Sequence, residues 1–582
     1  MLANFSRLLD WFCHIVIVIA GCALVGLVLM MGWLVFGRYV LNDTPTWIER
    51  GATLAILSIA LPVAAVGVRE RFHLSVLGFR EALPAQAQRW IAVGCDTLVG
   101  LFGIAMMINS RELVDMVWTF KIPLLGISQG WTYVPLMVCG GLIALFSLEQ
   151  LLLDIKRKGA PEQRGVAAGI PVAFTLGIAA VVGFMYEGLN PAVAFQQMAS
   201  GMSIFSLLAI PFFIFAGELM LHGGIARRLV AVASAAVGWM RGGLGMVDVA
   251  TSMLFGGISG SAVADTSATG TILIPAMKAK GYGVDYAVSL TATSSIAGIL
   301  IPPSHNMILY SLAAGGGISV TALFIAGIVP GLLMCSLLAI AAYVMAVRRG
   351  YPAEGWQGLR HLAWTFVDAL PGLMTAVIIL GGVLSGVFTV TESAAFGTIW
   401  ALVVTILVYR NLSWANFKVA VAASVRTSAV VFLLVGTATA FAYLLALYRL
   451  PDLLTDGMLA ISSNPIVILL MINICLLLLG CVMDMAALIL ITTPIFLPVV
   501  IAIDVDPVQF GMVMMMNLGL GLTTPPVGAV LFVGCAIGKI QMEEVMKTIW
   551  PFYGAIVVAL LLTTYVPAVS LTLPRLLLGY SG

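Results

Sequence analysis

Charged residues are scarce in this sequence. Asp, Glu, Lys and Arg make up only 9% of its 582 residues, whereas a soluble domain carries about a quarter. Hydrophobic residues make up 61%, and the mean hydropathy is +1.10. A soluble fold of this composition would have almost no polar surface, so the excess apolar residues must face lipid. The net charge of +2 gives no strong attraction to nucleic acid.

Motifs for disulfides, metal clusters and enzyme chemistry are also absent from the sequence. The eight cysteines are scattered through apolar runs and no CxxC occurs, so we interpret them as small buried hydrophobic residues. Neither HExxH nor a Walker A lysine motif is present, and no Cys, His and Asp group has catalytic spacing. We therefore expect neither an enzyme nor an organic cofactor.

The first 155 residues are predicted to form a block of four membrane-spanning helices. Each apolar run is near the ~20 residues that cross a bilayer, and the runs cover 12–37, 48–68, 90–110 and 132–154. The N-terminus and the loops 69–89 and 156–164 carry nine Lys and Arg residues, against four in the opposite loops. This asymmetry places both ends of the block in the cytoplasm. Residues 70–85 are predicted to form an amphipathic helix at the membrane surface.

A polar stretch, 156–166, separates this block from a second one. The stretch contains Lys, Arg, Pro and Gly and is predicted to be a cytoplasmic linker. The second block, 167–582, has apolar runs that are interrupted by Gly, Pro, Ser, Thr and Asp. Non-helical backbone at membrane depth is tolerated only against buried protein or a cavity, which favours a transport function for this block.

The second block contains an internal repeat. Asp265 is followed by Pro275, and Asp484 is followed at the same spacing by Pro494. Both pairs give the same offset in residue number, namely 219. A double proline follows each element, at 302–303 and at 525–526. We therefore predict two copies of one unit, at about 168–350 and 365–573.

Charges near the two copies indicate opposite orientations in the membrane. Arg241, Lys278 and Lys280 flank the first Asp–Pro element, whereas Asp504 and Asp506 follow the second. Each element is expected to enter and leave on the same side, as a re-entrant helical hairpin. Inverted repeats with broken helices near the bilayer midplane are typical of secondary transporters. The alternative, a channel, would not need coupled ion sites in both repeats.

The double prolines predict unpaired backbone carbonyls. Proline has no N–H, so the carbonyl four residues earlier loses its helical partner. The carbonyls concerned belong to Gly298, Ile299, Gly521 and Leu522. Hydroxyls lie nearby in the sequence, on Ser259, Ser261, Thr523 and Thr524. A small hard cation prefers oxygen ligands of this kind, so the paired breaks favour one Na⁺ site in each repeat. The alternative is a kink whose carbonyls are satisfied by neighbouring hydroxyls or water.

Intramembrane carboxylates are functional candidates. Asp265 and Asp484 could take a proton, face a cation or bind substrate hydroxyls, and the alternative is that each caps the second helix of its hairpin. Glu218, Asp248 and Glu392 lie near span ends, and we interpret them as structural. For His305, the sequence does not separate binding from packing.

Several stretches of the second block resemble the large membrane subunit of the tripartite ATP-independent periplasmic (TRAP) transporters. They are LAIPFFIFAGELM (208–220), GGIARRL (223–229), LFGGISGSAVADTSATG (254–270), GILIPPSH (298–305) and TTPPVG (523–528). The first block resembles the small subunit, through FGRYV (36–40), WIERG (47–51) and RERFHL (69–74). The resemblance covers nearly the whole chain and implies a fused small and large subunit.

The resemblance implies an all-α polytopic protein of the bacterial inner membrane with an elevator-type ion-transporter fold. It implies Na⁺-driven uptake of a small organic anion, a carboxylate such as a C4-dicarboxylate or a sialic acid, delivered by a separate periplasmic binding protein. The implied first sodium site comprises Ser259, Gly298, Ile301 and Pro303. The repeat then suggests a second site at Gly480, Gly521, Thr524 and Pro526. Substrate is expected near these sites, at Ser261, Asp265, Ser304, Asp484 and Thr523.

Overall fold

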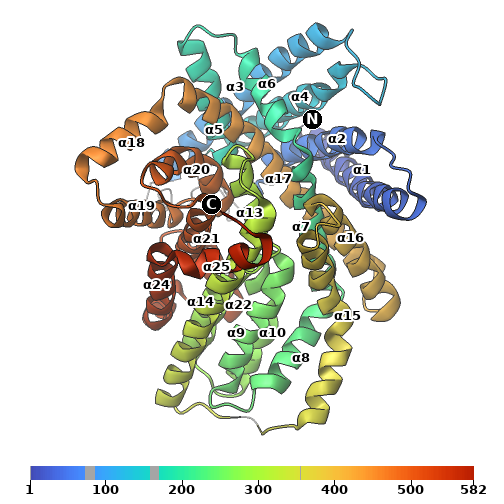
Figure 1. Ribbon diagram of the computed structural model, residues 1–582. Coiled ribbons are helices and arrows are strands. Elements are labelled where there is room, and N and C mark those ends of the chain that lie inside the picture. Colours follow the sequence, from blue (N-terminus) through green and yellow to red (C-terminus); the bar gives the residue numbers. More distant parts are fainter. Residues whose placement is uncertain (1, 73–84, 157–169, 354, 582) are drawn as a thin grey trace. The chain divides into compact units, whose positions relative to one another are not determined.

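The computed structural model describes residues 2–72, 85–156, 170–353 and 355–581 (Figure 1). Throughout this described part, the named secondary-structure elements are all helices. Ten of these helices are long and apolar enough to cross a membrane, and up to twelve spans result if two bent helix pairs are each counted as one. The expectation of an all-α polytopic membrane protein is therefore confirmed.

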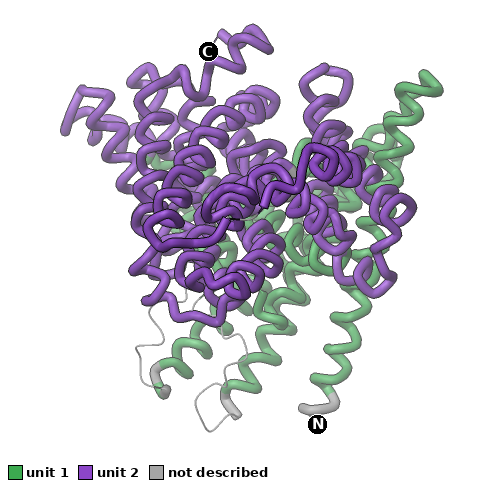
Figure 2. The backbone as a smooth tube through the Cα atoms, turned by 90° about the horizontal axis from the view of Figure 1, so that it is seen from below, with its two compact units in different colours: residues 1–211, 421–450 green, residues 212–420, 451–582 purple. Residues whose placement is uncertain are grey.

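The described chain divides into two compact units (Figure 2). Unit 1 comprises residues 1–211 and 421–450, and unit 2 comprises residues 212–420 and 451–582. This division does not follow the predicted linker at 156–166, because unit 1 includes helices from both blocks. The predicted surface helix at 70–85 falls largely on residues 73–84, and the predicted linker at 156–166 falls largely on residues 157–169. Both ranges lie outside the described residues.

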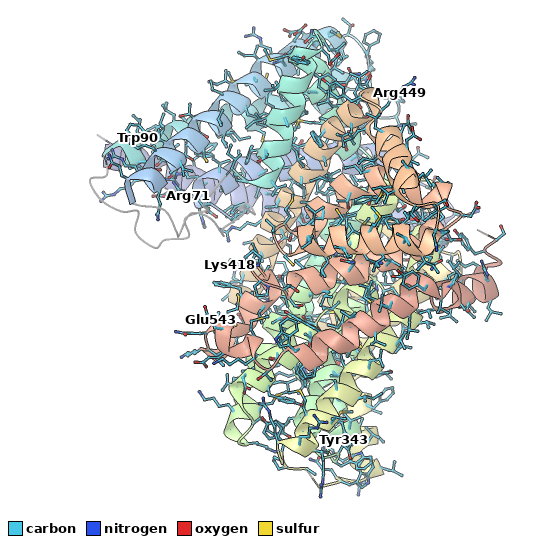
Figure 3. All side chains as sticks on the ribbon, turned by 90° about the vertical axis from the view of Figure 1, so that its left-hand side faces the viewer. Arg71, Trp90, Tyr343, Lys418, Arg449 and Glu543 are labelled. Carbon is cyan, nitrogen blue, oxygen red and sulfur yellow. The ribbon has the colours of Figure 1, made fainter. Side chains whose placement is uncertain are left out.

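Large apolar side chains project from the outer faces of both units (Figure 3). Trp90 in unit 1 is 67% exposed, and Phe532 in unit 2 is 64% exposed. Soluble monomers rarely expose contiguous apolar patches of more than a few hundred Å². Exposed apolar side chains on this scale are typical of helices that face lipid hydrocarbon.

Four long helices of unit 1 match the four spans predicted for the first block. They are α1 (Leu2–Phe36), α2 (Trp47–Glu70), α3 (Ala85–Val117) and α4 (Val134–Lys156). Helices α3 and α4 approach closely through small residues, since a Cβ atom at Gly103 would lie 2.8 Å from the carbonyl oxygen of Gly140. Close backbone approach at glycine is the usual way for membrane helices to associate.

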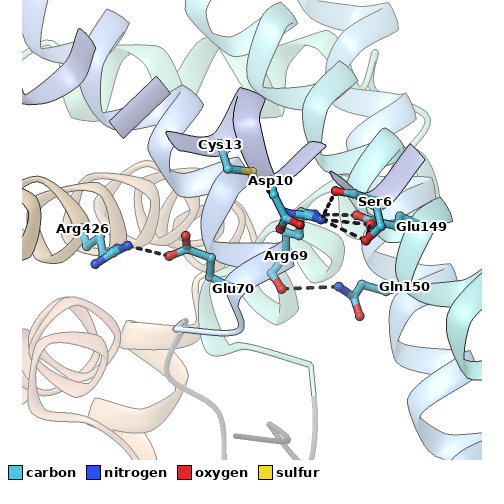
Figure 4. A network of polar contacts seen from close by, with 8 residues as sticks. All are labelled: Ser6, Asp10, Cys13, Arg69, Glu70, Glu149, Gln150 and Arg426. Carbon is cyan, nitrogen blue, oxygen red and sulfur yellow. Dashed lines mark hydrogen bonds and ion pairs between the residues drawn. The ribbon is translucent and has the colours of Figure 1, made fainter. Parts of the chain in front are cut away.

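A largely buried arginine bonds to three of these helices (Figure 4). Arg69, at the end of α2, donates from Nε to Glu149 Oε2 on α4 at 2.6 Å and from Nη1 to Asp10 Oδ1 on α1 at 2.7 Å. Ser6 donates its hydroxyl to Glu149 Oε1 at 2.7 Å, and the Glu149 side chain is only 1% exposed. Arg69, Asp10 and Glu149 therefore each have a partner of opposite sign.

The first copy of the repeat runs from the helix after the linker to a long helix that ends at Arg348. Its helices are α5 (Val172–Tyr186), α6 (Ala192–Met202), α7 (Ala209–His222), α8 (Ile225–Val237), α9 (Gly243–Ser259), α10 (Ala262–Ala279), α11 (Val284–Ser294), α12 (Ala297–Leu300), α13 (His305–Ala313) and α14 (Val320–Arg348). Helices α9 and α10 form a hairpin, and α11 to α13 form one interrupted helix that bends by 54°.

A single helix, α15 (Leu359–Leu384), connects this copy to the second one. The second copy comprises α16 (Val390–Val403), α17 (Trp414–Leu447), α18 (Leu450–Ile461), α19 (Pro465–Gly480), α20 (Met485–Ala502), α21 (Pro507–Leu522), α22 (Ala529–Gly538), α23 (Met542–Met546), α24 (Trp550–Tyr565) and α25 (Pro567–Leu578). Helices α19 and α20 form its hairpin, and α21 and α22 form its interrupted helix.

The helix bounds give the register of the repeat. Both ends of α10 differ in residue number from the ends of α20 by the same offset, namely 223. The N-caps of α11 and α21, Gly283 and Asp506, and the two double prolines have this offset as well. The offset predicted from the Asp–Pro elements, 219, is therefore wrong. It arose because α20 contains two prolines, Pro494 and Pro498, of which Pro498 is the counterpart of Pro275.

The same register moves the start of the second copy. Helix α5 corresponds to α16, so the copy begins near residue 390 and not at 365. Helix α15 has no counterpart in the first copy and lies between the two. Because α15 is long enough to span the membrane, it carries the chain to the other side before the second copy starts. If the first copy starts and ends on the same side of the membrane, this extra span places the second copy in the opposite orientation, as in an inverted repeat.

Candidate functional site

The tip of the first hairpin, between α9 and α10, has a glycine turn that lets other backbone approach closely. Helix α9 ends at Ser259, Gly260 adopts the left-handed conformation with φ +64°, and α10 begins at Ala262. Ser261 is the N-cap of α10, and its hydroxyl accepts a hydrogen bond from the backbone N–H of Ala264 at 3.4 Å. Glycine suits the left-handed position because it has no Cβ.

This tip lies directly on the first double-proline break, an arrangement that we call the first crossing. A Cβ atom at Gly256 would lie 2.9 Å from Gly298 Cα, and one at Gly260 would lie 3.2 Å from the carbonyl oxygen of Pro303. Asn306 Nδ2 donates to the carbonyl oxygen of Gly260 at 3.4 Å. Backbone atoms of the hairpin and of the interrupted helix therefore meet without side chains between them.

Polar groups of the first crossing remain available to a ligand. The hydroxyl of Ser304, which is the N-cap residue of α13, and Nδ1 of His305 are buried without a hydrogen-bond partner in the described part of the chain. Ile301 is in an extended conformation after α12, and its N–H donates to the carbonyl oxygen of Ala297 at 2.8 Å. The side chain of Ser259, predicted as a sodium ligand, lies outside the described part.

The second hairpin meets the second break in the same way, at what we call the second crossing. A Cβ atom at Gly521 would lie 2.7 Å from the carbonyl carbon of Gly480. Beyond the double proline, the N–H of Val527 donates to the carbonyl oxygen of Cys481 at 3.2 Å. Gly480 and Gly521 are distant in the sequence and were predicted as members of one site, and the structure places them in direct contact.

The backbone at the second break corrects one expectation. The carbonyl oxygen of Gly521 is not left unpaired, because it accepts a hydrogen bond from the N–H of Thr524 at 2.9 Å. The chain tightens into a turn just before the double proline, and this turn replaces the helical partner that proline removes. The hydroxyls of Thr523 and Thr524 each donate to the carbonyl oxygen of Leu520 at 2.8 Å. The Tyr553 hydroxyl donates to the carbonyl oxygen of Thr523.

The two interrupted helices also contact each other. A Cβ atom at Gly519 on α21 would lie 2.7 Å from a side-chain carbon of Ile296, which directly precedes α12. Helix α13 packs against α20, and α10 packs against α22, so elements of the two copies interdigitate within unit 2. The two crossings are therefore parts of one helix bundle.

The register pairs most of the predicted sodium ligands between the copies. Gly298, Ile301 and Pro303 correspond to Gly521, Thr524 and Pro526. The remaining two residues do not correspond to each other. The counterpart of Ser259 is Val482, and the counterpart of Gly480 is Gly257. The two predicted sites are thus equivalent in their backbone and different in their side chains.

The two predicted carboxylates occupy different positions. Asp484 is the N-cap of α20, where Oδ2 accepts from the N–H of Ala486 at 3.0 Å, so a capping role is present. Asp265 is not a cap. It lies one turn inside α10, fully buried, and neither of its carboxylate oxygens has a hydrogen-bond partner among the described residues. Its counterpart in the second copy is Leu488, and that of Asp484 is Ser261.

The three other acidic residues considered in the sequence have different surroundings. Glu392 forms a capping box with Thr389 at the start of α16, which confirms a structural role. Glu218 approaches His222 one turn later on α7, with 3.5 Å between Oε2 and Nδ1. Asp248 is fully buried on α9, where its Oδ2 accepts a hydrogen bond from the hydroxyl of Thr291 on α11 at 2.8 Å. Sequence reasoning missed the bond between Asp248 and Thr291, although polar residues at 248, 251 and 252 share one face of an apolar helix.

Comparison with protein families covers nearly the whole chain. Residues 165–569 match the family described as "Tripartite ATP-independent periplasmic transporter, DctM component", and residues 27–157 match the DctQ component of the same transporters. The chain belongs to the TRAP transporter family. It is a fused small and large TRAP permease, a multi-pass membrane transport protein and not an enzyme.

Relatives of this TRAP permease include fused and separate subunits. The isethionate TRAP transporter permease protein DctMQ of Oleidesulfovibrio alaskensis is 33% identical, over 90% of this chain and 88% of that protein. The sialic acid TRAP transporter large permease protein SiaM of Vibrio cholerae is 39% identical, over 71% of this chain and 96% of that protein. An uncharacterized protein, YgiK of Salmonella typhimurium, is 41% identical over 71% of this chain and 95% of that protein.

Proposed function

We propose that the chain performs Na⁺-coupled uptake of a small organic anion across the bacterial inner membrane, with the anion delivered by a periplasmic binding protein. The observation that carries this proposal is the pair of crossings. In each copy, a hairpin tip lies on a helix break with backbone atoms in contact, and the two breaks adjoin each other. Breaks of this kind present oxygen atoms and helix ends to a solute.

Sodium is the proposed coupling ion because the crossings offer oxygen ligands. No group of three or more His, Cys, Asp and Glu side chains that could hold a metal occurs in the described residues. A cation at the crossings would therefore be held by carbonyl and hydroxyl oxygens, which suit a hard ion. We propose Ser259, Gly298, Ile301 and Pro303 for one site, and Gly480, Gly521, Thr524 and Pro526 for the other.

An anionic substrate is favoured by the helix ends at the crossings. Helices α10, α13, α20 and α22 all begin there, and the N-terminus of a helix carries partial positive charge and free N–H donors. Ser261, Ser304 and Thr523 lie at these helix ends, and Asp484 can accept from substrate hydroxyls. Asp265 was expected with this group, but its position inside the hairpin removes it from the proposed substrate set. The relatives named for isethionate and sialic acid are named for organic anions.

An elevator-type movement is the proposed mechanism. Both hairpins and both interrupted helices belong to unit 2, so substrate and Na⁺ held at the crossings would move with this unit as one body. Substrate choice is assigned to the binding protein, which brings the anion to the permease.

The sodium assignment is tested with Ser259→Ala in the full-length chain. We expect uptake into proteoliposomes to need a higher Na⁺ concentration, while expression and the unfolding temperature without Na⁺ stay unchanged. The assay contains the cognate periplasmic binding protein, loaded with its ligand. A sodium response equal to that of the unaltered chain would remove Ser259 from the site. In a separate assay of the unaltered chain, uptake at the same rate with and without the binding protein would contradict the delivery step.

A further inference from the structure

A cavity of about 340 Å³ lies within unit 1, away from both crossings. Its walls come from α2, from the 3₁₀ helix η2 (Gln129–Thr132) and the loop before it, and from α6. The cavity is therefore lined by both the first and the second block. Sites for small ligands are typically cavities of about 300–1,000 Å³, so this one is large enough for a small ligand or a lipid headgroup.

One positive charge and several neutral polar groups line the cavity. The guanidinium of Arg50 has neither an ion pair nor a hydrogen bond among the described residues. Five neutral polar side chains of the lining also have no partner there, namely those of Gln129, Thr132, Tyr133, Gln196 and Ser200. The lining includes no Asp or Glu. A guanidinium with neutral donors and no competing carboxylate suits an anion, and a phosphate group in particular.

The wall formed by α2 is polar at one end and apolar at the other. Arg50, Leu54 and Leu57 share one face of α2 and follow the cavity for about 10 Å along the helix axis. Arg50 is in the first turn of α2, on the side that the distribution of Lys and Arg predicts to be periplasmic. The two leucines therefore lie deeper in the bilayer, where acyl chains begin.

Exposed tryptophans surround the mouth of the cavity. Trp47, the first residue of α2, is 47% exposed, and Trp131, directly before Thr132 of the lining, is 45% exposed. Trp118 is 49% exposed, and its ring centroid lies 6.3 Å from that of Trp131. Tryptophan is enriched at the level of the lipid headgroups. This end of the cavity therefore lies at that level, where its ligand would be a lipid.

The wall formed by η2 is held in place by its own hydrogen bonds. Ser128 donates its hydroxyl to the carbonyl oxygen of Trp118 at 2.7 Å and accepts from the N–H of Gly130 at 3.1 Å. The N–H of Gln129 donates to the carbonyl oxygen of Phe120 at 2.7 Å. A wall that is already ordered loses little conformational freedom when a ligand binds.

We propose that this cavity binds the headgroup of an anionic phospholipid. Arg50 pairs with the phosphate, and the amides of Gln129 and Gln196 bond to headgroup hydroxyls. A glycerol headgroup fits better than an amine headgroup, because the lining offers no carboxylate to an ammonium group. The bound lipid would join α2 of the first block to α6 of the second. This site does not depend on Na⁺ coupling or on the transported anion.

The test measures binding of phosphatidylglycerol to the delipidated full-length chain by native mass spectrometry, without Na⁺ and without a transported anion. Arg50→Gln should weaken one tight binding event about tenfold or more, since hydrogen bonds to a charged group are lost. The matched control is Arg111→Gln, whose exposed side chain pairs with Asp115 at 4.0 Å and is not part of the lining. Equal binding by both variants and the unaltered chain would overturn the proposal.

A second variant tests the cavity without removing its charge. Ser200 is exposed and lines the cavity, so Ser200→Trp should fill the space from its rim and weaken the same binding event while Arg50 stays in place. Unchanged binding in this variant would show that the lipid binds elsewhere.

Competing ligands separate the possible sources of the phosphate. At equal concentration, neither phosphatidylcholine nor soluble glycerol 3-phosphate should displace phosphatidylglycerol. Displacement by phosphatidylcholine would show that net charge is not selected, and displacement by glycerol 3-phosphate would show a site for a free anion. Either result would overturn the assignment to an anionic lipid. A weaker response of Arg50→Gln to the periplasmic binding protein, with lipid binding unchanged, would assign the cavity to protein docking instead.

Discussion

At the crossings, glycine is required because the neighbouring backbone leaves no room for a side chain. At Gly521 a Cβ atom would lie 2.7 Å from the backbone of Gly480, so even alanine must push the hairpin away from the break. We expect Gly521→Ala to lower the free energy of unfolding by about 1–3 kcal/mol, as overpacking of a tight interior does. It should also weaken Na⁺ binding at the second crossing. Thermal unfolding with and without Na⁺ measures both effects.

A matched control for this substitution lies in the connecting helix α15. At Gly381 nothing lies within 4 Å of the position of a Cβ atom. Gly381→Ala should leave Na⁺ binding unchanged and stabilise the helix by up to about 1 kcal/mol, since alanine has the higher helix propensity. Equal losses in the two variants would show that the contact at Gly521 is not the cause.

The Arg69 cluster gives a second prediction at the scale of single residues. Glu149 is almost fully buried and holds two nitrogens of Arg69. Glu149→Gln should lower the free energy of unfolding by about 1.5–3 kcal/mol, because it weakens two charge-assisted hydrogen bonds of Arg69 while Asp10 still pairs with the guanidinium. The control is Asp115→Asn, whose pair with Arg111 is exposed and worth less than about 0.5 kcal/mol. A loss at Glu149 no larger than the control would contradict the assignment.

Residue types alone predicted where the hairpins and the helix breaks lie. Glycine, serine and double proline in an apolar run marked both hairpin tips and both breaks. They did not predict how the carbonyl of Gly521 is satisfied, because the turn that pairs it with Thr524 depends on local backbone geometry. Asp248 was interpreted as structural because it lies near a span end, and its hydrogen bond with Thr291 appears only when α9 and α11 are folded together.

At the scale of helices, the sequence predicted the elements better than their register. The four spans of the first block, both hairpins and both interrupted helices occur where they were expected. The offset of the repeat was wrong because one Asp–Pro spacing happened to match a second proline in α20. Helix ends and caps fix the register, and it assigns Ser261, not Asp265, to the position of Asp484.

The connecting helix α15 gives a prediction about topology. Because α14 ends and α15 begins on one side of the membrane, Arg348 should be cytoplasmic and Ser385, just after α15, should be periplasmic. In a background without native cysteines, Ser385→Cys should react with an impermeant maleimide in intact cells. Arg348→Cys should react only after the cells are permeabilised. Labelling of both positions from outside would contradict an inverted repeat.

For the whole molecule, the sequence predicted the class and the TRAP family, and the comparisons bear these out. It did not predict the division into compact units, because that division depends on packing between distant segments and places α5, α6 and most of α17 with the first block. It also left the roles of the two intramembrane carboxylates open. The structure separates them: Asp484 caps a helix at a crossing, and Asp265 is buried inside a hairpin, where neither carboxylate oxygen has a hydrogen-bond partner among the described residues.

The central claim is that paired crossings couple Na⁺ to anion uptake. The most direct measurement is uptake of a radiolabelled ligand into proteoliposomes that contain the purified chain, in the presence of the loaded periplasmic binding protein. We predict rapid uptake with an inward Na⁺ gradient and none when choline replaces Na⁺ on both sides. Uptake that continues at the same rate with Na⁺ absent from both sides would contradict the account.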